Sequence, residues 1–346
     1  MDRTPKQNFL DMAEGIVPDY IMQYEFIPRK GARHAPPLCL LIPGIANDWR
    51  KTEEKLDPFG VHWVPAPDTP WALLPEPNHY LITDIRRWRD VVKFPDLSGI
   101  DWEAMAKRDL EANLKMGFDF DQSAKEITLH VGYFQQLMAM MGFTEGLTAL
   151  YEEPEECKAL LSALCDFWCE VYRRCFDYYE PDIIGQSDDT AAWKSPFISP
   201  EMYRDIFKPL YLREAQIGID RGLPGEFHNC GRCEPFVDDW ADFGIRYWNP
   251  AQTCNDLTAI KKRHPRDLVI IGGWDYRGRL CREDIGEEEF KQSIIDCIDR
   301  LAPGGGFVSM AGISGDPENE IVKKKNRWCR EVLETYGEDY YREGRG

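Results

Sequence analysis

The sequence of 346 residues contains no long hydrophobic run and no excess of basic residues. A helix that spans a bilayer needs about 20 mostly apolar residues, and polar or charged residues interrupt every apolar stretch of this chain before that length. The first fifteen residues, MDRTPKQNFLDMAEG, carry charges of both signs and lack the apolar core of a signal peptide. We therefore expect a protein with no membrane anchor that works in the cytoplasm.

Basic residues are too few for a surface that binds nucleic acid. Lysine and arginine number 42 against 60 aspartate and glutamate residues, which gives a formal net charge of −18. A negative electrostatic field repels phosphate backbones, and the sequence has no basic cluster that would counteract it. The acidic residues are spread along the chain with lysine and arginine between them, a pattern typical of solvated helix faces. We therefore expect no nucleic-acid partner.

The sequence motifs of several common enzyme classes are missing. No G-x-G-x-x-G follows the first expected strand, and no G-x-S-x-G, H-E-x-x-H or P-loop occurs. These absences weigh against a dinucleotide-binding fold and set aside the hydrolases and nucleotide triphosphatases that use such motifs. The eleven cysteines are odd in number, and three of them fall within one helical pattern, which argues against a disulfide framework. Reduced thiols in a cytosol fit better, and so many of them would suit an anaerobe.

Helices and short apolar strands alternate after residue 80. Before it, the sequence predicts a helix within residues 1–19, a buried strand at 20–27, and long loops or an insertion from 28 to about 77. Later helices are expected at 100–116, 134–155, 156–179, 199–221, 233–243, 255–263, 284–301 and 317–336. Later strands are expected at 127–132, 182–186, 225–229, 245–248, 268–272 and 306–310. This alternation indicates βαβ units and a parallel sheet.

The number of strands favours a closed barrel. With one strand from the loop-rich stretch the count is about eight, so the expected fold is α/β, a (β/α)8 TIM barrel with an N-terminal helical and loop-rich extension. An open doubly wound sheet is the second choice. No repeat or linker divides the chain, so we expect one domain over 1–346, with the extension and loops at 1–80 and the main barrel at 81–346. The active site of such a barrel lies at the carboxyl ends of its strands.

A histidine and a cysteine at one strand end are the first candidates for chemistry. Glu226, His228 and Cys230 are spaced by two and would share one face of an extended strand. An imidazole and a thiolate that converge there make half of a zinc site, which Glu226, Asp189 or Cys254 could complete. The alternative is a histidine that lines the barrel, held by hydrogen bonds beside an inert buried cysteine. Spacing alone does not decide between these interpretations.

Other polar and aromatic residues also follow expected strands. Asp188 and Asp189 can act as general acid or base, bind a cation or hydrogen-bond a substrate, or they can cap the helix before Ser199. Cys230 and Cys233 form a C-x-x-C with no second pair, which is a weak signal. Further candidates for substrate binding are Trp193, Trp274, Asp275 and Gln252. The tryptophans can wall an aromatic pocket or pack in the core.

An ordered set of motifs covers nearly the whole chain. They are T-P-K-Q-N-F at 4–9, D-P-F-G-V-H-W at 57–63, V-K-F-P-D-L at 92–97, I-D-W-E at 100–103, D-D-T at 188–190, S-P-E-M-Y at 199–203, F-H-N-C-G at 227–231, N-P-A-Q at 249–252, G-G-W-D at 272–275 and P-G-G-G-F-V-S at 303–309. Together they resemble the uroporphyrinogen decarboxylase superfamily, including its corrinoid-linked methyltransferase branch. The resemblance implies a (β/α)8 barrel with its pocket at the carboxyl ends of the strands and, by analogy, a homodimer.

The methyltransferase branch gives the leading hypothesis for function. In that branch zinc is held by an H-x-C on one strand, which His228 and Cys230 match, and by a cysteine after the last strand, where S-M-A-G-I-S-G at 309–315 has none. The first methyltransferases of anaerobic O-demethylation pass a methyl group from an ether or amine to the cobalamin of a corrinoid protein. The resemblance therefore implies a small, aromatic ether donor and a corrinoid protein partner. Assistance would come from a metal at His228 and Cys230 or from a carboxylic acid at Asp188 or Asp189.

Two other functions remain open. Uroporphyrinogen decarboxylases resemble one another in an R-Q-A-G-R segment that grips propionates, whereas this chain has F-I-P-R-K-G-A-R at 26–33, with Arg29 and Arg33 but not that motif. A decarboxylase-like lyase that acts on a tetrapyrrole or a small carboxylic acid is therefore the alternative. The third possibility is a non-catalytic barrel that binds a corrinoid or acts as a chaperone for one.

Overall fold

Seven parallel strands form the centre of the molecule, in the order β1-β4-β5-β6-β7-β8-β9. The computed structural model describes residues 3–67 and 69–344. The seven strands are β1 (Leu38–Leu41), β4 (Ala124–Ile127), β5 (Ile183–Ser187), β6 (Gly225–His228), β7 (Ile245–Ala251), β8 (Val269–Gly272) and β9 (Phe307–Val308). A separate antiparallel hairpin pairs β2 (Trp63–Ala66) with β3 (Thr69–Pro75).

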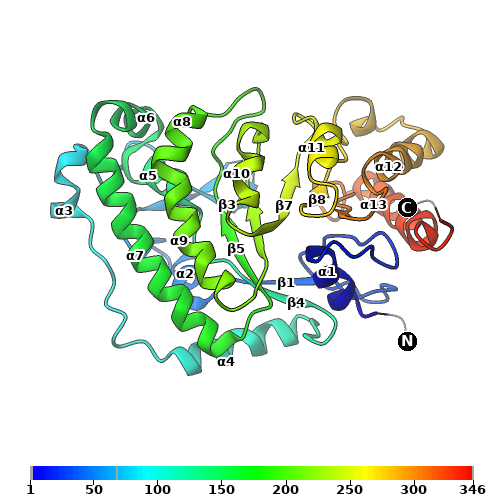
Figure 1. Cartoon of the computed structure of the whole chain (residues 1–346), viewed down its shortest axis with the longest axis horizontal. Helices are drawn as coiled ribbons and strands as arrows, with labels where there is room; N and C mark the ends of the chain where they lie inside the picture. The colour runs from blue at the N-terminus through cyan, green and yellow to red at the C-terminus, as the bar shows by residue number, and fades with distance from the viewer. Residues whose placement is uncertain (1–2, 68, 345–346) are drawn as a thin grey trace.

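Helices follow most strands and cover the outside of the sheet. The longer helices are α1 (Pro5–Ala13), α4 (Trp102–Lys115), α5 (Tyr133–Met141), α6 (Phe143–Glu152), α7 (Pro154–Tyr179), α9 (Lys208–Ile219), α11 (Leu257–Arg263), α12 (Glu287–Leu301) and α13 (Glu320–Val332). The short ones are α2 (Gly44–Asn47), α3 (Trp88–Val91), α8 (Pro200–Met202) and α10 (Val237–Ala241). In Figure 1, α7 and α9 lie side by side on one flank, and α12 and α13 lie on the other. Within the described part of the chain, no helix has the length and apolar content to cross a bilayer.

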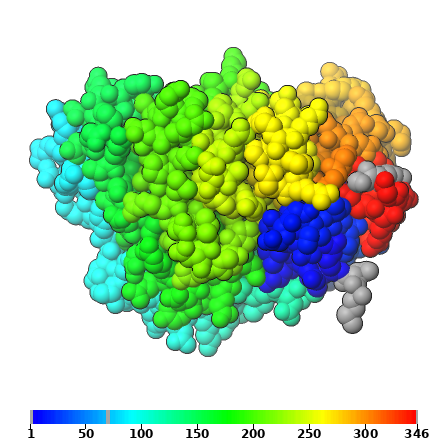
Figure 2. Space-filling model, viewed as in Figure 1, coloured from blue at the N-terminus to red at the C-terminus, as the bar shows by residue number. Residues whose placement is uncertain are grey.

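The sheet curls around a buried interior. Side chains from the strands, from residues 20–24 and from α1 form one cluster there: Phe9, Met12, Ala13, Tyr20, Met22, Tyr24, Leu38, Ala124, Ile183, Tyr247, Val269, Ile271 and Val308. The ring of Phe9 stacks on that of Tyr247 with centroids 4.5 Å apart, and the Tyr247 hydroxyl donates to the Phe9 carbonyl at 2.7 Å. The helix α1 therefore closes one end of the curved sheet. Figure 2 shows this helix against the C-terminal residues.

Residues 20–24 occupy the place expected for an eighth strand but make only a bridge. Gln23 bridges Ser309 in parallel, the Tyr24 N–H donates to the Ser309 carbonyl at 2.8 Å, and the Ser309 N–H donates to the Met22 carbonyl at 2.9 Å. Over the ranges 3–67 and 69–344, no backbone hydrogen bond joins this segment to β1. The chain bends at Phe26 and Ile27, which are exposed, so the strand expected at 20–27 does not continue.

Several other elements differ from expectation, two of them because of glycine. The strand expected at 127–132 lies at 124–127, and the residues after it turn into α5 at Gly132, where φ is +105°. The helix expected at 134–155 is two helices, divided at Gly142, where φ is +87° and an added Cβ would lie 2.7 Å from the Tyr80 ring. The hairpin β2–β3 lies within the stretch expected to be loops.

Candidate functional site

The carboxyl ends of β5 and β6 bring three candidate ligands together. Ser187 pairs with His228 in parallel register, and the Asp188 N–H donates to the His228 carbonyl at 2.9 Å. The loops that follow leave the sheet side by side. As a result the ligand atoms of Asp189, His228 and Cys230 all lie within 4.8 Å of one another. We call this half-buried carboxylate, imidazole and thiol the donor group.

The imidazole of the donor group is held in one orientation. His228 Nδ1 lies 2.7 Å from the Asn249 side-chain oxygen, and the Asn249 amide nitrogen hydrogen-bonds to Glu226 Oε1. Since the amide nitrogen is used by Glu226, the amide oxygen accepts from the ring N–H at Nδ1. His228 Nε2 is then left with its lone pair, 3.7 Å from Cys230 Sγ. Such a partner on the far nitrogen is how proteins orient a histidine ligand.

Neighbouring groups also fix the carboxylate and the thiol. Asp189 accepts from the Gln135 side-chain amide at 3.0 Å and from the Cys230 N–H at 2.8 Å. Gln252, an expected substrate-binding residue, instead accepts from the Gly231 N–H at 2.7 Å and so supports this loop. Burial and the nearby Asp189 raise the pKa of the Cys230 thiol. The thiol therefore keeps its proton unless a cation stabilises the thiolate.

Asp188 caps a helix instead of joining the donor group. Its side chain is completely buried and accepts from the N–H groups of Phe134 and Gln135 at 2.8 and 3.0 Å, in the first turn of α5. The Tyr211 hydroxyl donates to it at 2.6 Å. Burial raises the pKa of Asp188 to about 6. The helix that begins after Ser199, which Asp188 might have capped, has Ser199 itself as its cap.

Glu226 lies deeper in the curl, next to a second carboxylate. Its Oε1 accepts from the Tyr24 hydroxyl at 3.2 Å and from Asn249. Burial and the Glu126 charge raise the pKa of Glu226, and burial raises the pKa of Glu126. Neighbouring buried carboxyl groups disfavour each other's ionised form. Asp189, and not Glu226, is the third member of the donor group.

A cavity of about 240 Å³ opens above this carboxylate pair, and we call it the polar cavity because most of its lining residues are polar or charged, although most of its exposed wall is apolar. Its lining comes from the ends of β1, β4, β5, β6 and β7 and from the segments beside them: Tyr24, Phe26, Leu40, Ile42, Ala46, Arg50, Glu126, Thr128, Leu129, His130, Val131, Ser187, Glu226, His228 and Asn249. The imidazole of the donor group therefore faces a space lined by titratable side chains.

An apolar cavity of about 410 Å³ lies on the other side of the donor group. The hairpin β2–β3 and the helices α5 and α6 supply most of its lining: Trp63, Leu73, Leu74, Pro75, Pro77, Tyr80, Val131, Phe134, Gln135, Met138, Ala139, Gly142, Phe143, Asp189 and Phe197. Val131 lines both cavities. The donor group thus lies between an acid-lined space and a space with aromatic and aliphatic walls.

None of the four predicted substrate-binding residues, Trp193, Trp274, Asp275 and Gln252, lines either cavity. The Arg277 guanidinium stacks over the Trp193 ring at 3.5 Å and pairs with Asp275, which lowers the pKa of Asp275 to about 2. The Trp274 ring N–H donates to Ser293 Oγ at 3.0 Å. These side chains are occupied with one another or with neighbouring helices.

The other cysteines near the donor group do not join it. Cys233 is buried and donates to the Asn229 side-chain oxygen at 3.1 Å, so the second sulfur of the C-x-x-C is used in packing. Cys254 is half-buried, and its charge is close enough to affect the pKa of Cys230. Within the described residues, the group of three ligand atoms at this place is Asp189, His228 and Cys230.

The sequence interpretation missed the residues that β4 contributes. Glu126, Thr128 and His130 repeat the spacing of Glu226, His228 and Cys230, and this repeat could have revealed them. His130 Nε2 lies 2.6 Å from a carboxylate oxygen of Glu214, which is completely buried. Arg50 was also missed, because it comes from the loop-rich stretch that carries no strand-end signal.

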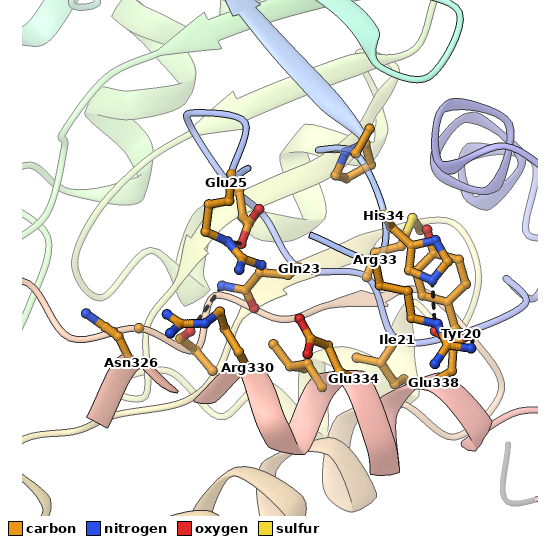
Figure 3. A pocket seen from close by; sticks show the side chains of 17 residues that line it. Tyr20, Ile21, Gln23, Glu25, Arg33, His34, Asn326, Arg330, Glu334 and Glu338 are labelled. Atoms are coloured by element: carbon orange, nitrogen blue, oxygen red, sulfur yellow. Dashed lines mark hydrogen bonds and ion pairs between the residues drawn. The ribbon is translucent and has the colours of Figure 1, made fainter. Parts of the chain in front are cut away.

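A third cavity of about 290 Å³ lies outside the site, between residues 20–37 and α13. Glu338 reaches into it and pairs with Arg33 at 3.0 Å and with His34 at 2.8 Å, whereas Arg330 and Glu334 project from the C-terminal helix (Figure 3). Its lining includes no residue of the donor group. It is therefore separate from the candidate site.

Comparisons with known proteins agree on the family and the fold. Residues 121–323 match the family model described as uroporphyrinogen decarboxylase (URO-D), and no curated protein matches the chain. A solved methyltransferase from Methanosarcina mazei is similar with a TM-score of 0.61 at 11% identity, over 98% of this chain and 100% of that chain. A D-psicose 3-epimerase from Clostridium cellulolyticum has a TM-score of 0.35 at 11% identity, over 68% of this chain and 84% of that chain. At these identities the first likeness concerns the fold, and the second is too distant to inform function.

Proposed function

Because this chain belongs to the uroporphyrinogen decarboxylase (URO-D) family, we propose that it is a methyltransferase that passes a methyl group from a small aromatic ether to a corrinoid protein. The observation that carries the proposal is the place of the donor group between two cavities. His228 lines the polar cavity and Asp189 lines the apolar one. A molecule bound in the polar cavity can therefore reach His228, and a molecule bound in the apolar cavity can reach Asp189.

The donor atoms of this group fit a zinc ion. Zinc binds carboxylate oxygen, imidazole nitrogen and thiolate sulfur, and catalytic zinc sites use three protein ligands with one open position. Asp189, His228 and Cys230 offer one atom of each kind within 4.8 Å of one another. A zinc ion bound there would act as a Lewis acid toward the ether oxygen, which is otherwise a poor leaving group.

The apolar cavity suits the aromatic part of the methyl donor, the aryl ether. Its volume of about 410 Å³ falls within the roughly 300–1,000 Å³ of cavities that hold small organic ligands. Phe134 and Phe197 form a parallel stack in its wall, with centroids 5.7 Å apart and planes 5° apart. An aryl ring that packs there excludes water and brings its methoxy group toward Asp189.

Asp189 serves the reaction in either version of the mechanism. As a metal ligand, Asp189 completes the donor group. Without a metal, it is the acidic side chain nearest to an aryl ether bound in the apolar cavity. In the transfer, the bond between methyl carbon and ether oxygen breaks, a bond between methyl carbon and the partner's Co(I) forms, and the oxygen leaves as a phenol after it takes one proton. Asp188 acts as a positioning residue, because it ties α5 to the end of β5.

Methyl transfer from aryl methyl ethers to a Co(I) corrinoid protein tests the proposal directly. We expect turnover that Asp189→Asn and Cys230→Ser lower by about 100-fold or more, since even an outer partner of a metal ligand is worth about 10–100-fold. The matched control is Cys254→Ser, which removes a half-buried thiol outside the donor group and should keep near-normal turnover. Absence of transfer from ether, amine and thioether donors alike would refute the proposal.

One observation favours a carboxy-lyase as the second candidate. Arg50 lines the polar cavity beside the Glu126–Glu226 pair, and its buried Nε has no hydrogen-bond partner among the described residues. A guanidinium in that position can bind a substrate carboxylate. The volume of about 240 Å³ favours a small acid over a tetrapyrrole. Release of carbon dioxide that Arg50→Gln abolishes would support this alternative, and formation of coproporphyrinogen would contradict the size argument.

A further inference from the structure

A second group of three metal-ligand types lies at the base of the hairpin β2–β3. His62 precedes β2, Glu76 follows β3, and His79 comes one turn later. Their ligand atoms all lie within 4.8 Å of one another. We call these three residues the hairpin cluster. Among the described residues, this cluster and the donor group are the groups of this kind.

The backbone holds the hairpin cluster in place. The strands pair with Trp63 opposite Pro75, the Glu76 N–H donates to the His62 carbonyl at 2.8 Å, and the His79 N–H donates to the Glu76 carbonyl at 3.2 Å. Two side chains then meet at one oxygen. His62 Nδ1 lies 2.6 Å from Glu76 Oε2, and His79 Nδ1 contacts the same atom. The three donors therefore converge from a short, hydrogen-bonded stretch of chain.

The charge of the cluster suits a divalent cation. The ion-pair partners of Glu76 in the described part of the chain are the two histidines, with no lysine or arginine among them. The negative charge of Glu76 is therefore not balanced by the permanent cation of a lysine or arginine among these partners. His264 offers a contrast, since one imidazole there lies between the carboxylates of Asp238 and Asp267, and Asp238 also pairs with Arg263.

The geometry points to a second zinc site, formed by His62, Glu76 and His79. Two imidazoles and one carboxylate are a ligand set that zinc sites use, and three protein ligands leave one position for water. The side chains are 38%, 28% and 71% exposed, so an ion can enter from solvent. Imidazole ligands favour zinc over magnesium or calcium, which prefer oxygen alone.

A metal at this place would stiffen the wall of the apolar cavity. Trp63 and Pro75, the paired residues next to His62 and Glu76, both line that cavity, as do Pro77 and Tyr80 on either side of His79. The ion joins the two ends of the hairpin and the turn after it. The ion would therefore hold this wall in place while its fourth position stays open to water.

Metal content of the full-length chain tests the assignment. After removal of metals with a chelator and reloading with zinc, we expect two bound ions per wild-type chain and one in His79→Gln, whose exposed side chain can change without harm to folding. The affinity of the second ion should fall about 100-fold or more in both His79→Gln and His62→Gln. His264→Gln is the matched control, because it removes a histidine that contacts carboxylates outside either cluster, and it should retain two ions.

Cobalt separates the two sites by their ligands. Only the donor group contains sulfur, so only its cobalt ion should give a cobalt–thiolate charge-transfer band, which Cys230→Ser removes. The ion of the hairpin cluster should give visible ligand-field bands alone, and these should disappear in His79→Gln. Metal binding at each of the two sites is thus measured independently, whether or not methyl transfer occurs.

Two outcomes would overturn the assignment. One is a wild-type chain that binds no ion beyond the one that Cys230→Ser and His228→Gln remove. The other is a second ion whose affinity and ligand-field bands stay unchanged in both His62→Gln and His79→Gln.

Discussion

At the scale of single residues, what each histidine contacts decides what it can do. His264 lies between the carboxylates of Asp267 and Asp238, which raise the pKa of its imidazole against the effect of burial. The Nδ1 atom of His228 instead contacts the amide oxygen of Asn249, and its Nε2 atom lies 3.7 Å from Cys230 Sγ. Its neighbours therefore suit His228 to be a ligand, whereas His264 is suited to be a charged partner in an ion pair.

The ion pairs of His264 predict a dependence of stability on pH. Burial lowers the pKa of this imidazole, but hydrogen bonds to Asp267 and Asp238 and their charges raise it by more, so the net shift is upward. A raised folded-state pKa gives stabilisation that is complete below the unfolded value of about 6.5 and is lost as the pH rises through the folded value. His264→Gln should therefore lower the melting temperature more at about pH 6 than at about pH 9. An equal loss at both pH values would contradict this account.

At the scale of elements, the bounds of three strands were predicted well. β5, β6 and β8 begin and end within a residue of expectation, because each is a short apolar run that a turn residue closes. The end of β4 was misplaced because LHVG at 129–132 is as apolar as a strand, and only the positive φ of Gly132 shows that the chain has turned. The hairpin β2–β3 was missed because proline within a run argues against a strand.

Gly132 is the point where the loops after β4 and β5 touch. A Cβ at this position would lie 2.2 Å from the Ser187 carbonyl oxygen and 2.3 Å from Asp188 Cγ, and the φ of +105° strains any residue with a side chain. Gly132→Ala should therefore lower the free energy of unfolding by about 3 kcal/mol or more, from strain and overpacking together.

Gly222→Ala is the control for backbone strain. Gly222 also has a positive φ, +71°, but a Cβ there would meet nothing within 4 Å. Its substitution should cost only about 1–2 kcal/mol of strain. Denaturant unfolding compares the two variants, and an equal loss would show that the close contact at Gly132 does not matter.

At the scale of the whole molecule, the parallel order of β5 and β6 creates the donor group. The sequence predicted this neighbourhood, since consecutive βα units place their strand ends at one edge of a sheet. The sequence did not show which of Glu226, Asp189 and Cys254 is the third member of the donor group. That choice depends on which side of the strand end each side chain takes, and Glu226 points inward to Glu126 whereas Asp189 lies in the loop beside Cys230.

The stability of the curved sheet also depends on helix α1, which fills the far end of its interior. Phe9 is completely buried against Tyr247, so Phe9→Ala should lower the free energy of unfolding by about 3–5 kcal/mol. Gln7→Ala, on the exposed side of the same helix, should change it by no more than about 0.5 kcal/mol. Denaturant unfolding followed by tryptophan fluorescence measures both. A small effect of Phe9→Ala would mean that α1 is not part of the folded core.

X-ray absorption at the zinc edge tests the central claim most directly, because it reports which atoms surround the metal. The measurement uses His79→Gln, so that the ion of the hairpin cluster does not contribute. The account predicts one sulfur at about 2.3 Å with nitrogen and oxygen at about 2.0–2.2 Å, and loss of the sulfur contribution when Cys230→Ser is added. A zinc ion with no sulfur neighbour, or no bound zinc at all, would contradict it.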